Sequence, residues 1–319
     1  MRIEKIELKV GELPDGTPLF LRGVFIGNQG GPVVALSSSI HGVEVNGFEV
    51  MRRLYLKLIE VKQVDGGILL LPMISPLAVA MRSIVNPLDS MNLNRVFPGR
   101  TNGILTERIA FNVIKVIRDY NVECLVDFHG GGYCCESAPH VAIVDVDRED
   151  LLKRAIDLAS AMGFKYVAVL RRIELEEELR LKATLDAAAM RMGIPSLLAD
   201  FGSWRYQHHH YIEFAVQGLM NMLRHLGVLR GPVEERQKPI IVERAWIRAN
   251  EGGMFYPAVK LLDHVSNGDL LGKIINPCFE VVEEVKSSHE GVVLLIRTYP
   301  PVFTGEEVAM IGVSRSDNS

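Results

Sequence analysis

Short apolar runs that alternate with longer stretches of helical periodicity limit this chain to a small set of folds. Six runs rich in Val, Leu and Ile are bounded by turn residues, and they read PVVALSS, GILLLP, ECLVDFH, VAIVD, KYVAVL and SLLADF. Helical patterns occupy residues 44–60, 104–119, 148–162, 174–191 and 208–226. Runs that are apolar throughout are typical of strands covered on both faces. The alternation therefore predicts an α/β fold with a helix-covered sheet.

Two further segments depart from this alternation. The first 30 residues contain the β-type runs IEKIELKV and PLFLRGVFIG, which we expect to form a hairpin at one edge of the sheet. After Gly231-Pro232, helical periodicity gives way to short β-type runs and frequent glycine. We therefore expect an α/β domain at residues 1–235 and a small all-β domain at residues 236–319.

Composition limits the partners and the compartment. The formal net charge of −4 gives no support to nucleic acid or an anionic membrane as a partner. There is neither an apolar run long enough to span a membrane nor a start with the apolar core of a signal peptide. The four cysteines show no paired CxxC spacing, so we expect a cytoplasmic protein. The expected partner is a small molecule, and assembly into a homo-oligomer stays open.

Polar side chains that could bind a metal follow two of the apolar runs. His41 follows VVALSSSI, Glu44 lies three residues later, and His129 follows ECLVDF. Ligands of α/β sheets bind outside the carboxyl ends of the strands, so these side chains are expected to face one point. Two imidazoles and a carboxylate, with a fourth position for water, are the ligand set of a catalytic zinc site. Asp127, two residues before His129, is placed to orient it.

Each of these signals has a simpler interpretation. HxxE is a short pattern, and a histidine at a strand end is often only a hydrogen-bonded surface residue.

The polar loop NPLDSMNLNRVFPGR, residues 86–100, carries Asn94 and Arg95 before Phe-Pro-Gly. An arginine in a rigid loop suits bidentate capture of a carboxylate, whereas the alternative is an arginine that only holds the loop.

The motifs HGVE, NLNRVFPG, DFHGG and PSLLADFG, in this order, resemble the succinylglutamate desuccinylase/aspartoacylase family of zinc-dependent deacylases. The late segment from EGGMFYPAVK to EEVAMIG resembles the barrel-sandwich-like C-terminal domain of the branch described as predicted deacylases. The resemblance implies a sheet of the zinc-carboxypeptidase type. It also implies one Zn²⁺ per chain, held by His41, Glu44 and His129.

The resemblance implies roles for four further side chains. Asn94 and Arg95 would hold a substrate carboxylate, and Arg95 is also suited to steadying an oxyanion. Arg82 lies where the family often has another arginine that contacts substrate. Arg205 lies in the loop after the PSLLADFG motif and is a candidate for setting specificity.

The chain departs from the family pattern at two positions. Asp200 stands where the family has its base, a glutamate in an E-x-G context, and aspartate is shorter by one methylene. A general base must reach its water within about 3 Å, so Glu213 and Glu174 are alternatives. Asn92 stands where the family usually has aspartate, and Asp89 is a candidate to take over that role.

The implied reaction is metal-assisted hydrolysis of an N-acyl amino acid or a similar small amide that bears a carboxylate. Asp200 would pass the water proton to the leaving amine. The alternatives are a metallocarboxypeptidase-like peptidase and a non-catalytic protein that binds a metal or ligand, which the aspartate at position 200 favours. The three histidines at 208–210 are adjacent on a predicted helix, so they point apart and are not expected to bind one metal.

Overall fold

The computed structural model describes residues 2–61, 63–170 and 183–314. Its helices are α1 (Asn46–Ile59), α2 (Pro76–Met81), the 3₁₀ turn η1 (Leu93–Arg95), α3 (Leu105–Asp119), α4 (Glu149–Met162), α6 (Leu185–Arg191) and α7 (His209–His225). Its strands are β1 (Ile3–Glu12), β2 (Pro18–Gly27), β3 (Val33–Ser38), β4 (Gly67–Leu71), β5 (Cys124–His129), β6 (Cys135–Val144), β7 (Tyr166–Leu170), β8 (Ser196–Gly202), β9 (Ile240–Arg248), β10 (Gly253–Pro257), β11 (His264–Val265), β12 (Leu270–Ile275), β13 (Val281–Lys286), β14 (Gly291–Arg297), β15 (Pro301–Val302) and β16 (Glu307–Ser314).

Most elements lie where the sequence pattern predicts them. The first two strands form an antiparallel hairpin at one edge of the main sheet, and the six apolar runs form β3 to β8. The helical patterns appear as α1, α3, α4 and α7, and the last part of the 174–191 stretch appears as α6. Residues 174–182 of that stretch lie outside the described residues. The short elements α2 and η1 were not predicted, because neither is long enough to show a period.

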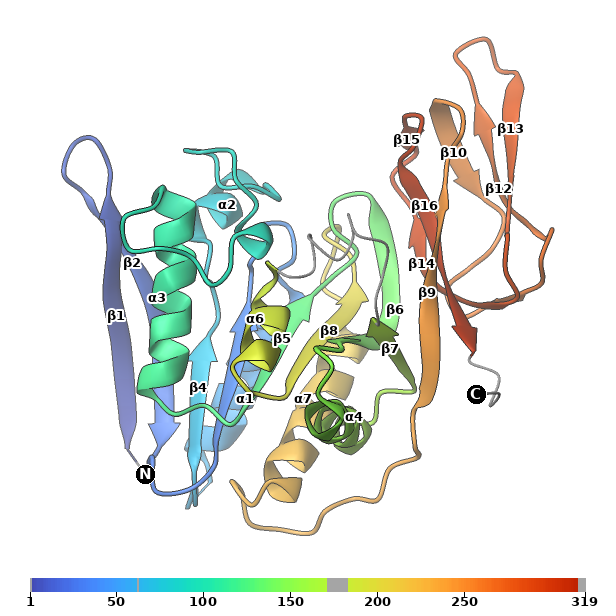
Figure 1. The fold of residues 1–319 in the computed structure, drawn as a ribbon. Coiled ribbons are helices and arrows are strands. Elements are labelled where there is room, and N and C mark those ends of the chain that lie inside the picture. The colour runs from blue at the N-terminus through green and yellow to red at the C-terminus, as the bar shows by residue number, and fades with distance from the viewer. Residues whose placement is uncertain (1, 62, 171–182, 315–319) are drawn as a thin grey trace.

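Among the described residues, the main sheet has twelve strands in the order β1-β2-β4-β3-β5-β8-β6-β7-β9-β16-β14-β11. The central strands β4, β3, β5 and β8 are parallel neighbours, and β6 is antiparallel to β8. Helices cover both faces of this part of the sheet (Figure 1). The fold is therefore a mixed α/β fold whose parallel strands end at one common edge.

Alternate residues of the buried strands divide the interior into two cores. Val34 and Leu36 of β3 pack into a core with α1, α4 and α7, whereas Val33 and Ala35 pack into a second core with α3 and α6. Each fully buried Val, Leu or Ile side chain contributes about 1.5–3 kcal/mol to stability. Covered on both faces, the strands form a rigid base for the side chains at their carboxyl ends.

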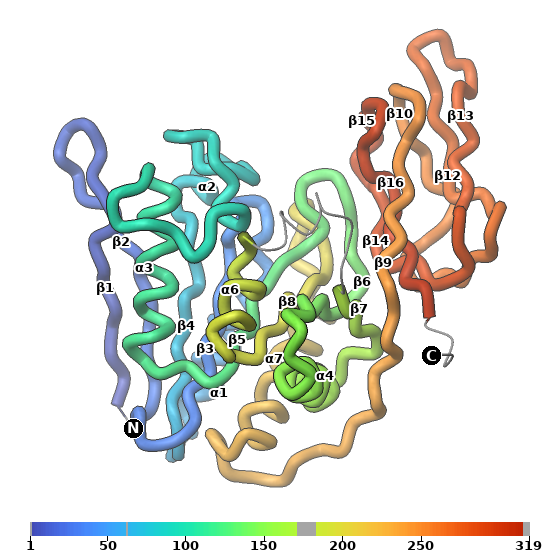
Figure 2. The backbone as a smooth tube through the Cα atoms, viewed as in Figure 1, coloured from blue at the N-terminus to red at the C-terminus, as the bar shows by residue number. Residues whose placement is uncertain are grey.

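The C-terminal region is built from strands alone within the described residues 240–314. Four of these strands continue the main sheet, because β9 pairs with β7 and β14 pairs with β6. The others form a four-stranded sheet in the order β13-β12-β10-β15. Figure 2 shows this region at the side of the body opposite the N-terminal hairpin. The division into domains at residue 235 stays a prediction. No helix among the described residues is long and apolar enough to cross a membrane.

Asn221 of α7 fastens the segment that leads from α7 to β9. Its side chain is buried, and its Nδ2 donates to the carbonyls of Ala161 and Glu234 at 2.9 and 3.0 Å. Its Oδ1 accepts from the backbone N–H of Glu234 at 2.7 Å. One amide therefore joins α4, α7 and the connection to the C-terminal strands.

Replacing this amide tests how much the connection depends on it. We expect Asn221→Ala to lower the free energy of unfolding by about 2–3 kcal/mol, because the truncation leaves buried backbone groups without partners. Urea denaturation followed by circular dichroism measures the change. The control is Asn112→Ala on α3, whose amide donates within its own helix to Arg108, and we expect a change below about 0.5 kcal/mol. Equal effects of the two substitutions would contradict this role of Asn221.

Candidate metal centre

The loop that follows β3 is shaped by a glycine. A Cβ atom at Gly42 would lie 1.9 Å from the carbonyl oxygen of Ala78, so only glycine allows the loop to pack against α2. The N–H of Gly42 donates to the carbonyl of Ser83 at 2.7 Å, which fixes the loop on the chain after that helix. This packing holds His41 and Glu44, on either side of Gly42, at the carboxyl end of the sheet.

His41, Glu44 and His129 converge as the sequence predicts. One carboxylate oxygen of Glu44 lies 3.0 Å from Nδ1 of His41, and the other lies 2.8 Å from Nδ1 of His129. All three side chains are buried, and one ligand atom from each lies within 4.8 Å of the others. The carboxylate thus lies between the two Nδ1 atoms, one from each imidazole. In this geometry a metal cation can be bound by all three side chains.

The outer nitrogen of each imidazole is held by an oxygen. Nε2 of His41 lies 3.2 Å from Oδ1 of Asn92, and Nε2 of His129 lies 2.9 Å from Oδ2 of Asp127. The other oxygen of Asp127 accepts from the hydroxyl of Ser37 at 2.6 Å. An oxygen acceptor favours the tautomer with hydrogen on Nε2, which directs the lone pair of Nδ1 towards Glu44. The residues therefore fit a metal ion bound through both Nδ1 atoms and the Glu44 carboxylate.

The charges of the group agree with this fit. Burial alone raises the pKa of Glu44, but the neighbouring His41 and His129 lower it to about 2. Burial lowers the pKa of His129, but Asp127 and Glu44 outweigh that effect and raise it well above its ordinary value. Without a metal, a proton on His129 balances the buried carboxylate, and binding a cation at this nitrogen would release it.

Asp200 lies beside the metal-ligand candidates on the same face of the sheet. It is the register partner of His129 on β5 and of His140 on β6. Its Oδ1 is buried and has no hydrogen-bond partner among the described residues. Burial raises the pKa of Asp200, and the opposite charge of His140 reduces that effect. The carboxylate is thus placed to exchange a proton near His129, and its catalytic role stays a prediction.

The loop over residues 86–100 lies against the cluster, and its residues have distinct contacts. Oδ1 of Asn94 accepts from the backbone N–H of Leu185 at 2.9 Å, so this oxygen holds the start of α6. Arg95 is exposed, and its guanidinium donates to the carbonyl of Asn94 at 2.7 Å. The amide nitrogen of Asn94 is the donor suited to the predicted contact with a substrate carboxylate, whereas the guanidinium of Arg95 is at the surface.

The structure corrects the interpretation of Asp89. Its carboxylate accepts from the backbone N–H and the hydroxyl of Thr106 at 2.8 and 2.7 Å, and thereby caps the first turn of α3. Asn92 itself contacts His41, so Asp89 does not take over that position. Asp89 lies three residues before Asn92 in the sequence. Spacing alone could not show whether its carboxylate replaces the family's aspartate or caps a helix.

The other predicted residues lie further out. Arg82 is exposed at the end of α2 with a φ of 50°, and Arg205 is exposed and donates to the carbonyl of Thr298 at 2.6 Å. Glu213, an alternative base, is on α7 with its carboxylate 3.7 Å from Arg53. Glu174, the other alternative, lies outside the described residues.

The three adjacent histidines begin α7 and do not converge on one point. His208 stands at the N-cap position, and its Nε2 accepts from the N–H of Ser203, in the loop before the helix, at 3.0 Å. Its ring stacks on Tyr206 and Tyr211. His209 points elsewhere and contacts Arg53. The histidine run therefore fixes the loop after β8 and is not a second metal site.

Two residues of the centre were not found from the sequence. Ser37 lies in an apolar run and gave no signal apart from its hydroxyl. His140 lies within β6, and the pairing of β6 with β8 shifts register between Ser137 and His140. Strand periodicity therefore does not predict which face of the sheet His140 occupies. Only the register of the folded sheet places it beside Asp200.

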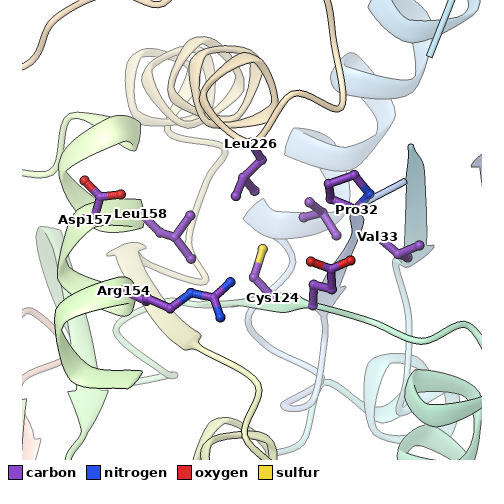
Figure 3. A pocket seen from close by; sticks show the side chains of 9 residues that line it. Pro32, Val33, Cys124, Arg154, Asp157, Leu158 and Leu226 are labelled. Carbon is purple, nitrogen blue, oxygen red and sulfur yellow. The ribbon is translucent and has the colours of Figure 1, made fainter. Parts of the chain in front are cut away.

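A separate cavity lies at the opposite ends of the same strands. It has a volume of about 60 Å³ and is lined by Pro32, Val33, Cys124, Arg154 and Leu226, among others (Figure 3). Pro32 and Val33 stand at the start of β3, whereas His41 follows its end. The residues that line the cavity include none of the predicted site residues.

Comparisons with known proteins agree with this geometry. At 25% identity over 288 residues, 88% of this chain and 82% of the other, the chain is similar to N-alpha-acetyl-L-2,4-diaminobutyric acid deacetylase of Halomonas elongata. Its fold is similar to that of succinylglutamatedesuccinylase/aspartoacylase from Rhodobacter sphaeroides, with a TM-score of 0.86 and 22% identity over 99% of this chain and 96% of that one. The product-bound ectoine utilization protein EutE (DoeB) from Ruegeria pomeroyi has a TM-score of 0.86 and 22% identity, covering 98% and 95% of the two chains.

The family description of the succinylglutamate desuccinylase/aspartoacylase catalytic domain matches residues 30–226. This range contains the three metal-ligand candidates, the loop over residues 86–100 and Asp200. It also contains the parallel strands that bring these groups together. The chain therefore belongs to the succinylglutamate desuccinylase/aspartoacylase family.

Proposed function

We propose that this protein is a zinc-dependent deacylase that hydrolyses the amide bond of an N-acyl amino acid or a similar small amide bearing a carboxylate. The observation that carries the proposal is the Glu44 carboxylate between Nδ1 of His41 and Nδ1 of His129. Two imidazoles and a carboxylate suit zinc. The deacetylase from Halomonas elongata acts on an N-acetylated amino acid, which supports amide hydrolysis by this chain too.

The proposed chemistry divides the work between the ion and the protein. Zn²⁺, when bound, supplies a Lewis acid that polarises the amide carbonyl and acidifies water. Asp200 accepts the proton of the attacking water and delivers it to the leaving amine. Since burial raises its pKa, Asp200 is a stronger base than an exposed aspartate. Asn92 and Asp127 keep the two imidazoles in the tautomer that binds a cation.

The short side chain of Asp200 is compatible with this role. Asp200 is in direct register with His129 on the neighbouring strand, and adjacent strands lie only about 4.8 Å apart. The two side chains leave the same face of the sheet, so the carboxylate starts its reach beside a metal-ligand candidate. This placement partly makes up for the shorter reach of aspartate, which lacks one methylene of glutamate.

Arginine side chains are proposed to recognise the substrate. Arg95 is exposed one residue from the loop amide that fastens α6, which suits it to binding a carboxylate or a developing oxyanion. We include Asn94, Arg82 and Arg205 as further substrate contacts. Arg205 donates to the carbonyl of Thr298, between β14 and β15. Comparison of N-acyl amino acids with a peptide panel separates a deacylase from a peptidase.

The proposal extends to architecture and location. We propose that the sheet is of the zinc-carboxypeptidase type and that residues 236–319 form a small barrel-sandwich-like domain. We also propose a cytoplasmic location, because all four cysteines are free thiols. The expected partner remains a small molecule, and a homo-oligomer remains open.

The base is tested by Asp200→Asn, which keeps the size of the side chain and removes its basicity. We expect kcat to fall about 10²- to 10⁴-fold while zinc content is unchanged. Steady-state kinetics on the best N-acyl amino acid of the panel, with metal analysis of the same samples, measures both quantities. The control Glu213→Gln alters an exposed carboxylate of α7 and should leave kcat unchanged. Full activity of Asp200→Asn would contradict the proposed base.

The outer contacts of the histidines are tested by metal affinity. We expect Asp127→Ala and Asn92→Ala each to weaken zinc binding about 10- to 100-fold, because the imidazoles lose the acceptor that orients them. Competition with a chromophoric chelator gives the affinity, and the melting temperature shows whether each variant is folded. The control His225→Ala removes an exposed histidine that pairs with Asp157. Wild-type affinity in both site variants would show that these contacts do not support the metal.

A further inference from the structure

Cys134 and Cys135 form a pair of free thiols that the proposed mechanism does not use. They are adjacent in the chain, and their sulfur atoms lie 3.2 Å apart. A disulfide bond is about 2.05 Å long, so the two sulfur atoms would need to approach by about 1 Å. Because the Cα atoms of neighbouring residues lie only about 3.8 Å apart, the peptide between the two cysteines would adjust as the bond forms. The same spacing suits chelation of one thiophilic atom by both sulfurs.

The two thiols are unequal, which favours a reaction in a defined order. Cys134 is partly exposed in the turn before β6, whereas Cys135 is buried as the first residue of that strand. The contact with Cys135 and the nearby Arg297 guanidinium lower the pKa of the Cys134 thiol, although its partial burial opposes this. The contact with Cys134 and burial raise the pKa of Cys135. Because the thiolate is the nucleophile, Cys134 is the attacking group.

The other cysteines lack these properties. Burial raises the pKa of Cys124 to about 12, which keeps it as an unreactive thiol. Cys278 is exposed between β12 and β13 in the C-terminal region. Among the described contacts, only Cys134 and Cys135 place two sulfur atoms within bonding reach of each other.

The turn that carries the pair touches both halves of the structure. A Cβ atom at Gly132 would lie 4.0 Å from Oε1 of Glu44, so the turn passes beside the metal centre. The carbonyl of Cys134 accepts from the N–H groups of Thr298 and Tyr299 at 2.8 and 2.9 Å. A covalent change in this turn would therefore occur between the metal centre and the C-terminal strands.

We propose that Cys134 and Cys135 are a redox-active vicinal dithiol that a hydroperoxide oxidises to a disulfide. The Cys134 thiolate attacks the terminal peroxide oxygen, the O–O bond breaks, and the proton that left Cys134 goes to the departing alkoxide. The sulfur of Cys135 then attacks the resulting sulfenic acid, the S–S bond forms, and hydroxide leaves with the Cys135 proton as water. Two thiols and one hydroperoxide thus give one disulfide, one alcohol and one water.

Mass spectrometry tests the proposal without any substrate, so its result does not depend on the proposed deacylase activity. The fully reduced protein is treated with hydrogen peroxide, alkylated with iodoacetamide and digested with chymotrypsin. Cleavage after Phe128 and Tyr133 separates Cys124 from the pair. We expect the peptide beginning at Cys134 to be lighter by two hydrogen atoms and unalkylated, and reduction before alkylation should restore two alkylation sites.

Matched variants identify the sulfurs involved. Cys134→Ser and Cys135→Ser should each abolish the disulfide, whereas Cys278→Ser should leave it unchanged. In a second measurement, the reduced protein should bind one phenylarsine oxide through both thiols, and each of the two site variants should lose this adduct. The proposal is overturned if peroxide leaves both thiols alkylatable or adds only oxygen to them. It is also overturned if the Cys134→Ser and Cys135→Ser variants retain the arsenical adduct.

Discussion

The carboxylate of Glu44 between two imidazoles is the interaction on which the rest of the site depends. Each oxygen faces one Nδ1 atom, at 3.0 Å for His41 and 2.8 Å for His129, in a buried setting. A buried carboxylate is costly unless charge or hydrogen bonding compensates it. A proton on His129 provides part of that compensation without a metal, and a divalent cation would provide it with one. The buried carboxylate of Glu44 therefore favours a positive charge at the centre of the site.

The sheet produces this arrangement by simple rules. Parallel strands end at one edge, which brings the residues at or just beyond the carboxyl ends of β3, β5 and β8 together although they are far apart in the chain. Alternation along β5 puts Asp127 and His129 on one face, and direct register puts Asp200 beside His129. The two apolar cores fix these strands, so the distances of the site are set by packing that is remote from it.

The sequence was sufficient to predict the strands, most helices and the three metal-ligand candidates, because these depend on local periodicity and on strand ends. It was not sufficient for contacts set by tertiary register. The position of His140 depends on a pairing irregularity of β6, and the contact of Asn92 with His41 depends on how a long loop folds back. The pairing of β14 with β6 likewise joins strands distant in the chain, so the sheet continues where composition suggested a break.

The redox-active cysteine pair and the metal centre share one structural element, the turn after β5, but neither proposed activity requires the other. The turn after β5 carries the glycines beside Glu44 and also the cysteine pair. Its carbonyl contacts with Thr298 and Tyr299 show that the C-terminal strands support the loops of the metal centre. The exposed Arg205, in the loop after β8, also donates to the carbonyl of Thr298, so two loops of the catalytic-domain side contact that region.

The most direct test of the central claim is the metal content of the purified, untagged protein, measured by inductively coupled plasma mass spectrometry beside a His41→Ala variant. The account predicts about one zinc per chain in the wild type and its loss in the variant, since two imidazoles and one carboxylate form the site. Absence of bound metal in the wild type, even after zinc is supplied, would contradict the account.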